Sequence, residues 1–103
     1  MLTPNVELEN KTVLVTGAAG FIGANLVQKL LSSVKGINLV GLDNMNDYYD
    51  VSVKEYRLSE IQKAAAANRD GNWIFIKGSI ADKNLIETIF TEYKPEIVVN
   101  LAA

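Results

Sequence analysis

The chain has 103 residues, of which 49% are hydrophobic, and a formal net charge of -2. This length suits about one small domain and excludes a cofactor domain followed by a separate substrate domain, while the hydrophobic content excludes disorder. The absence of cysteine excludes disulfides and thiolate metal sites, and the absence of histidine removes the commonest metal ligand, so any metal would have to be held by oxygens. No metal site is predicted, and the slight acidic excess argues against a nucleic-acid partner.

The N-terminal ten residues lack the charged start and apolar core of a signal peptide. No apolar run approaches the roughly 20 residues that span a bilayer. We therefore expect a soluble, cytoplasmic protein with no membrane partner.

Strand and helix patterns alternate along the first half of the chain. Residues 12–16 form a β-branched apolar run that predicts a strand buried on both faces. Apolar residues then recur at helical spacing from Phe21 to Val34, which predicts a helix, and Gly36 is placed to end it. Residues 37–43 predict a second strand.

A second helix is expected from about 53 to 68, because Ser52 and Glu55 have the spacing of a capping box. Three of its residues are expected to face inward: Tyr56, Ile61 and Ala65. Residues 68–72 break this helix, and residues 73–77 predict a third strand.

Asp82 is placed to cap the next helix, which Pro95 stops. One apolar stripe is expected along it: Leu85, Ile86, Ile89, Phe90 and Tyr93. Residues 96–102 predict a fourth strand. Strands that alternate with helices, without hairpin turns, imply parallel strands joined by right-handed crossovers. The predicted fold is therefore α/β, an open, doubly wound sheet with strand order 3-2-1-4 and helices on both faces.

Three glycines separate the first strand from the first helix. In such a turn Gly17 permits the tight bend, Gly20 lets a pyrophosphate approach the backbone, and Gly23 lets the helix pack closely on the sheet. The helix N-terminus adds free N–H groups and partial positive charge. A phosphate-binding P-loop would need Lys and then Ser or Thr after the last glycine, where Ala24 and Asn25 stand instead, which excludes ATP or GTP binding by that route.

Asp43 lies 20 positions after Gly23, at the end of the second predicted strand. A carboxylate there accepts hydrogen bonds from the ribose hydroxyls of a dinucleotide and repels a 2′-phosphate. No arginine follows within residues 43–50, so NAD is predicted in preference to NADP.

These residues resemble a known family. The segment "TGAAGFIG" has the spacing of the extended short-chain dehydrogenase/reductases, and the chain as a whole looks like the N-terminal part of an NAD-dependent nucleotide-sugar epimerase or dehydratase. The stretch "DNMNDYYDVSVKEYRL" is most similar to the UDP-glucuronate 4-epimerase branch. The resemblance implies a partial Rossmann-type domain and, for a longer parent enzyme, epimerisation of a UDP-sugar through a transient 4-keto sugar.

The resemblance also implies which residues contact the cofactor. The pyrophosphate would be lined by Gly17, Gly20, Phe21 and Ile22, with Gly23 behind them. The adenosine ribose would be held by Asp43, Asn44 and Asn46. Ser79 and Ile80 would flank the adenine, although the family usually has aspartate where Ser79 stands, which implies a weaker adenine contact. The nicotinamide side would be followed by Leu101, Ala102 and Ala103.

The catalytic residues of the family are not found in this chain. Relatives use a Tyr-x-x-x-Lys pair, and none of the tyrosines has lysine four positions later: Tyr48, Tyr49, Tyr56 and Tyr93. We expect the chain to be an inactive, N-terminal portion of a longer enzyme. Three alternatives stay open: a UDP-glucose 4-epimerase, a dTDP-glucose 4,6-dehydratase, or a non-catalytic NAD-binding sensor module. Self-association through the sheet edge at 97–103 is also expected, because that edge lacks lysine and proline.

Overall fold

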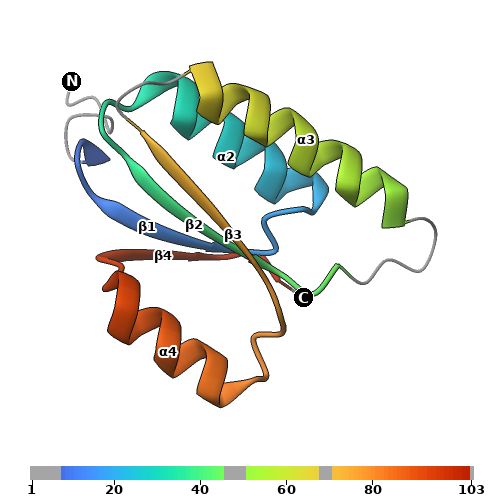
Figure 1. Cartoon of the computed structure of the whole chain (residues 1–103), viewed down its shortest axis with the longest axis vertical. Helices are drawn as coiled ribbons and strands as arrows, with labels where there is room; N and C mark the ends of the chain where they lie inside the picture. Colours follow the sequence, from blue (N-terminus) through green and yellow to red (C-terminus); the bar gives the residue numbers. More distant parts are fainter. Residues whose placement is uncertain (1–7, 46–50, 68–70, 103) are drawn as a thin grey trace.

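The computed structural model describes residues 8–45, 51–67 and 71–102. Within these ranges strands and helices alternate along the chain (Figure 1). The elements are β1 (Thr12–Thr16), α2 (Phe21–Ser33), β2 (Asn38–Asp43), α3 (Val51–Ala67), β3 (Asn72–Lys77), α4 (Lys83–Tyr93) and β4 (Ile97–Asn100). The expected elements are all present, with ends that differ by a few residues.

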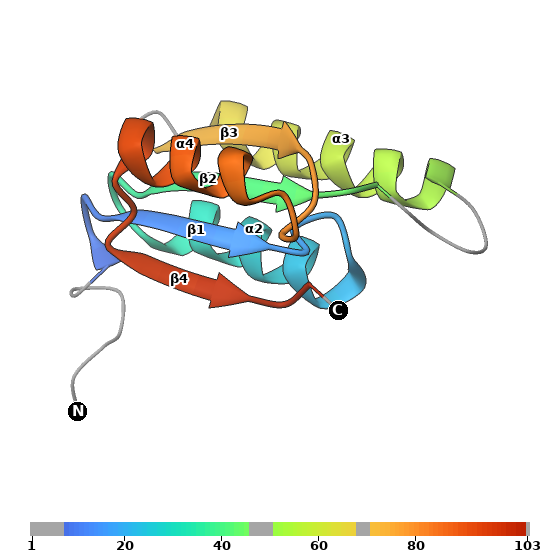
Figure 2. The same ribbon diagram turned by 90° about the horizontal axis from the view of Figure 1, so that it is seen from below.

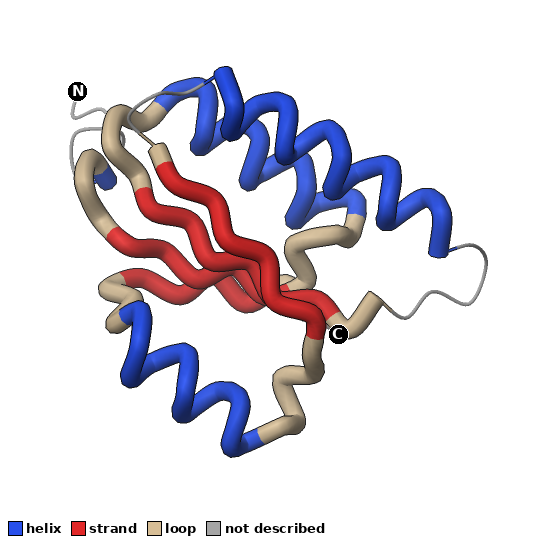
Figure 3. The backbone as a smooth tube through the Cα atoms, in the orientation of Figure 1, coloured by secondary structure: helices blue, strands red, loops and turns tan. Residues whose placement is uncertain are grey.

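The four strands form one parallel sheet in the order β3-β2-β1-β4. Helices α2 and α3 cover one face of this sheet and α4 lies on the other (Figures 1 and 2). The predicted strand order, strand direction and placement of helices on both faces are therefore confirmed. Because all four strands run in the same direction, the loops that follow their carboxyl ends gather at one end of the sheet (Figure 3).

Hydrophobic side chains are buried on both faces of the sheet. Val13 and Val15 of β1 pack towards α2 and α3, whereas Leu14 between them packs with Ile89 of α4. Alternate residues of one strand thus serve two cores, which is why β1 is a continuous apolar run. No described helix is long and apolar enough to cross a membrane.

Two expectations about the start of α3 are wrong. The helix begins at Val51, so Ser52 lies inside its first turn and is not the N-cap residue. Tyr56 is 64% exposed, while Ile61 is buried and Leu58 packs with it in the core. The reason is geometric: Leu58 is three residues from Ile61, but Tyr56 is five residues away and therefore about 140° round the helix. Ala65 packs against the same core, as expected.

The last helix follows the expected pattern with one exception. The Asp82 side chain accepts a hydrogen bond from the Leu85 N–H at 3.1 Å, which confirms the cap, and the helix ends just before Lys94 and Pro95. Phe90 is exposed, contrary to expectation, because it lies about 100° round the helix from buried Ile89. Similarly, Val34 caps the end of α2, so Gly36 follows that cap and does not form it.

Candidate functional site

The loop between β1 and α2 is held by backbone contacts that require glycine. Gly17 has a positive φ of 74°, and its N–H donates to the Leu42 carbonyl at 2.8 Å. A Cβ at Gly17 would lie 2.8 Å from the Leu101 carbonyl carbon, because β4 ends directly beside this turn. Both the conformation and the close approach favour glycine, as the tight-turn prediction implied.

Gly20, at the N-cap of α2, and Gly23, inside the helix, have different surroundings. A Cβ at Gly23 would lie 2.1 Å from the Gly17 carbonyl oxygen, so α2 could not pack this closely on the turn with any larger residue. A Cβ at Gly20 would meet only the Gly17 oxygen, at 3.3 Å, and otherwise open space. Gly20 is also the N-cap residue of α2, where no side chain caps the helix. The open approach to an uncapped helix N-terminus is suited to an anion.

A cavity of about 350 Å³ lies in front of this turn, at the carboxyl ends of the strands. It is lined by Gly17, Gly20, Leu42, Asp43, Asn44, Lys54, Gly78, Ser79, Ile80, Leu101 and Ala102. Most of the predicted site residues are therefore brought together around one cavity. Three do not line it: Phe21 and Ile22 are exposed at the start of α2, and Gly23 is behind the turn. Asn46 and Ala103 lie outside the described residues.

Asp43 ends β2 with a carboxylate that is held in place by its neighbours. Only 5% of the residue is exposed. Its Oδ2 accepts from the Ala19 N–H at 3.0 Å, and its Oδ1 accepts from the Met45 N–H at 2.7 Å. The first bond ties the carboxylate to the glycine-rich turn, and the second is local, formed two residues along the chain. Asp43 is thus oriented by backbone donors on both sides.

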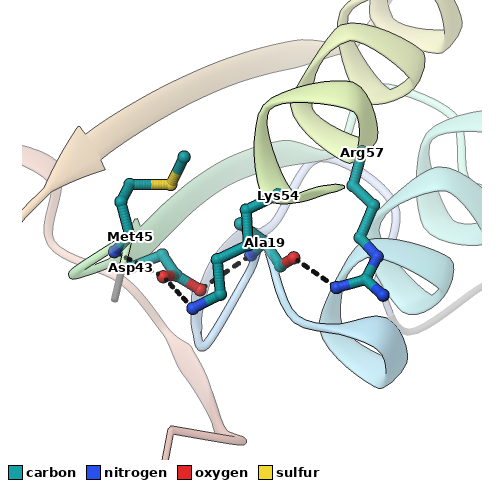
Figure 4. Close-up of polar contacts among 5 residues, drawn as sticks. All are labelled: Ala19, Asp43, Met45, Lys54 and Arg57. Carbon is teal, nitrogen blue, oxygen red and sulfur yellow. Dashed lines mark hydrogen bonds and ion pairs between the residues drawn. The ribbon is translucent and has the colours of Figure 1, made fainter. Parts of the chain in front are cut away.

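Two cationic side chains from α3, which were not predicted as site residues, reach this part of the site (Figure 4). The Lys54 ammonium lies 2.9 Å from Asp43 Oδ1, and both side chains are largely shielded from solvent. Arg57 Nη1 donates to the Ala19 carbonyl at 3.3 Å, and its guanidinium lies 5.9 Å from the centre of the Phe21 ring. The sequence did contain a signal for them: Lys54 and Arg57 are three residues apart, so they lie on one face of the predicted helix.

The remaining walls come from the ends of β3 and β4. Ser79 Oγ accepts from the Ala81 N–H at 3.0 Å, which leaves a further lone pair and the hydroxyl proton for a ligand. On the opposite side, the buried Thr16 hydroxyl donates to Asn100 Oδ1 at 2.5 Å and accepts from the Leu101 N–H at 3.2 Å. Thr16, which was not predicted as a site residue, therefore attaches the end of β4 to the glycine turn.

Taken together, the parallel sheet reverses its winding between β1 and β4, and the cavity lies at that point, as in nucleotide-binding doubly wound folds. The fold and the cavity define a Rossmann-like α/β protein. Residues 14–103 match the family described as GDP-mannose 4,6 dehydratase, and the chain belongs to that family.

The relatives of this chain include enzymes named for nucleotide sugars and a protein whose name states no activity. The chain is 42% identical over 91 residues to Protein CapI of Staphylococcus aureus, covering 88% of this chain and 25% of that protein. It is 40% identical over 90 residues to the UDP-glucuronate 4-epimerase of Thermodesulfobacterium geofontis, covering 87% of this chain and 25% of the relative. The chain thus spans about a quarter of the length of these relatives.

A solved structure agrees with this assignment. The crystal structure of dTDP-glucose 4,6-dehydratase from Bacillus anthracis, in complex with NAD, superposes with a TM-score of 0.73 at 30% identity. The match covers 90% of this chain and 27% of the dehydratase. The relatives therefore include both an epimerase and a dehydratase that act on nucleotide sugars.

Proposed function

We propose that this chain forms the NAD-binding part of a nucleotide-sugar epimerase, with UDP-glucuronate as the substrate of the whole enzyme. One observation carries the proposal: a buried, oriented carboxylate, Asp43, faces a cavity whose adjoining wall is the open glycine turn. NAD, when bound, supplies a hydride acceptor and donor for the sugar carbon. The residues of this chain bind and orient that cofactor.

The glycine turn supports the placement of the cofactor's pyrophosphate. The absence of a Cβ at Gly20 leaves room for a pyrophosphate beside the first N–H groups of α2, at Phe21 and Ile22. In this proposal Asp43 and Asn44 bind the adenosine ribose, and Ser79 and Ile80 contact the adenine.

The nicotinamide end of the cofactor is assigned to the opposite side of the cavity. Leu101 and Ala102 follow β4 there, and the Thr16 hydroxyl holds their backbone near Gly17. Because these contacts are made by backbone atoms, this part of the site places few demands on side-chain identity.

The choice of UDP-glucuronate is supported by the named epimerase relative and by the resemblance of residues 43–58 to that branch. A dTDP-glucose 4,6-dehydratase is the second candidate, because the superposed dehydratase is similar over 90% of the chain. A chimera separates the two: residues 1–103 replace the matching part of the T. geofontis epimerase. Conversion of UDP-glucuronate by the chimera supports the first candidate, and activity restored only in a matching dehydratase chimera contradicts it.

Cofactor binding by the chain itself is tested by nuclear magnetic resonance. On titration of the isotope-labelled chain with NAD up to about 10 mM, we expect shifts of the amide signals of Gly17, Gly20 and Ser79. The affinity should be weak, since a cofactor with few surrounding walls buries little of its surface. Titration with UDP-glucuronate alone is the control and should leave these signals unchanged. Absence of shifts with NAD, or shifts confined to the opposite end of the sheet, would contradict the proposal.

A further inference from the structure

The Asp43 carboxylate is not a bare negative charge. Among the described residues it accepts from three donors: the Ala19 N–H, the Met45 N–H and the Lys54 ammonium. A carboxylate offers about four acceptor positions, so most of them are filled before any ligand is considered. Lys54 is also one of the residues that line the cavity. Any group that approaches Asp43 from the cavity therefore meets an ion pair.

The ion pair has a low exposure, with 13% of the Lys54 side chain and 3% of the Asp43 side chain accessible. Charges that are partly shielded from solvent are screened less by water and salt than surface charges. The Lys54 ammonium therefore cancels much of the repulsion that Asp43 alone would exert on a phosphate. The prediction that NAD is preferred to NADP considered Asp43 and the absence of arginine after it, but not this lysine.

Lys54 alters the charge of the site more than its geometry. The two backbone N–H groups hold both oxygens of Asp43 without help from Lys54. Arg57, one turn further along α3, contacts the Ala19 carbonyl and the Phe21 ring and does not contact Asp43. Within the described part of the chain, Lys54 is thus the cation that contacts the Asp43 carboxylate.

We propose that Lys54 is a specificity-determining residue of the cofactor site, which weakens the discrimination of Asp43 against a 2′-phosphate. The proposal rests on the proposed function, because it assumes that the adenosine ribose of a dinucleotide lies at Asp43. In the unmodified chain, NADP then binds only moderately more weakly than NAD. The preference for NAD over NADP then depends on the charges of Asp43 and Lys54 together.

The test is a double-mutant cycle read as the ratio of the dissociation constants for NADP and NAD. Lys54→Gln leaves Asp43 negatively charged, and we expect the ratio to rise about tenfold. Asp43→Asn leaves the lysine positively charged, and we expect NADP to bind more tightly than in the unmodified chain. Adding Lys54→Gln to Asp43→Asn should remove that gain.

The matched control is Lys63→Gln on the same helix. Lys63 pairs with Glu60 at 3.0 Å on the exposed side of α3, away from the residues that line the cavity. Glu60, through a hydrogen bond and its charge, raises the pKa of Lys63 above that of an ordinary lysine. Lys63→Gln removes the same charge and should leave the ratio unchanged.

The outcomes separate the two proposals. A ratio that is the same in Lys54→Gln, Lys63→Gln and the unmodified chain overturns the role of Lys54 while NAD binding stands. Failure of the unmodified chain to bind either cofactor overturns the proposed function and the role of Lys54 with it. If Lys54→Gln does not fold, the NADP affinity of Asp43→Asn is compared with that of the double variant, because neither of these leaves a buried carboxylate without a cation. Equal NADP affinities of these two variants overturn the role of Lys54.

Discussion

Gly20 and Gly23 stand three residues apart, the first as the N-cap residue of α2 and the second inside the helix, yet a side chain would meet different surroundings at the two positions. At Gly23 the nearest atoms are backbone atoms of Gly17 and Ala18, which cannot move independently of the turn. At Gly20 the backbone is extended, with φ -72° and ψ 170°, a conformation that any residue adopts. The two glycines therefore differ in role: one is required for packing and the other keeps an approach open.

This difference predicts opposite effects of two alanine substitutions. Gly23→Ala should lower the free energy of unfolding by about 2 kcal/mol or more, because the added methyl group overlaps the Gly17 carbonyl. Gly20→Ala should change it by less than about 1 kcal/mol, yet weaken NAD binding. Urea unfolding and the NAD titration measure the two effects. Equal stability losses, or undiminished NAD binding by Gly20→Ala, would contradict the assignment.

At the scale of one element, we expect the stability of helix α4 to depend on the residue that caps its N-terminus. It is the one described helix on its face of the sheet (Figure 2), and its buried contacts centre on Ile89. Its N-terminus is capped by Asp82, whose own N–H donates to the Ser79 carbonyl at 3.0 Å. The cap thus connects the stability of α4 to the turn that carries Ser79 in the candidate site.

Asp82→Ala should therefore lower the free energy of unfolding by about 1 kcal/mol, the typical value for loss of an N-cap side chain. Hydrogen exchange should also accelerate in the first turn of α4, near Leu85. Glu87→Ala on the exposed side of the same helix is the control, with an expected change within about 0.5 kcal/mol. A cap variant as stable as this control would show that α4 is held by its packing alone.

At the scale of the whole molecule, the edge of the sheet formed by β4 carries exposed apolar side chains. β4 pairs with β1 on one side and, among the described residues, with no strand on the other. Val98 is 47% exposed there, and Leu101 is exposed as well. Val99, in contrast, packs against the core beside α2 and α3. Exposed apolar edge strands promote pairing between molecules.

We predict that the 103-residue chain forms oligomers as its concentration rises. Val98→Lys should reduce this association with little loss of stability, because it places a charge on an exposed edge position. Val99→Lys is unsuitable, since Val99 is partly buried against the core and a charge there would lose solvation. Light scattering over a concentration series is the measurement. Monomers at all concentrations, or equal association by the Val98 variant, would rule out this edge as the contact.

The order of elements, their approximate bounds and the glycine turn could be predicted from the sequence, because each depends on residues that are close along the chain. Periodicity at 12–16 and 21–34 sets strand and helix, and Asp82 caps a helix that starts at the next residue. Asp43 was predicted as a site residue on similar grounds, by its distance from Gly23 in a strand–helix–strand unit. The strand order followed from general rules of winding.

Only the tertiary structure decided which side chains meet across those elements. Thr16 contacts Asn100 from 84 residues away, and Lys54 of α3 reaches Asp43 of β2. The exposed position of Tyr56 was likewise decided by the way α3 packs on α2. Such contacts depend on the rotation and placement of whole helices, which local patterns do not specify. The sequence by itself determined the fold and the location of the cavity, and packing determined the charge that surrounds the carboxylate within it.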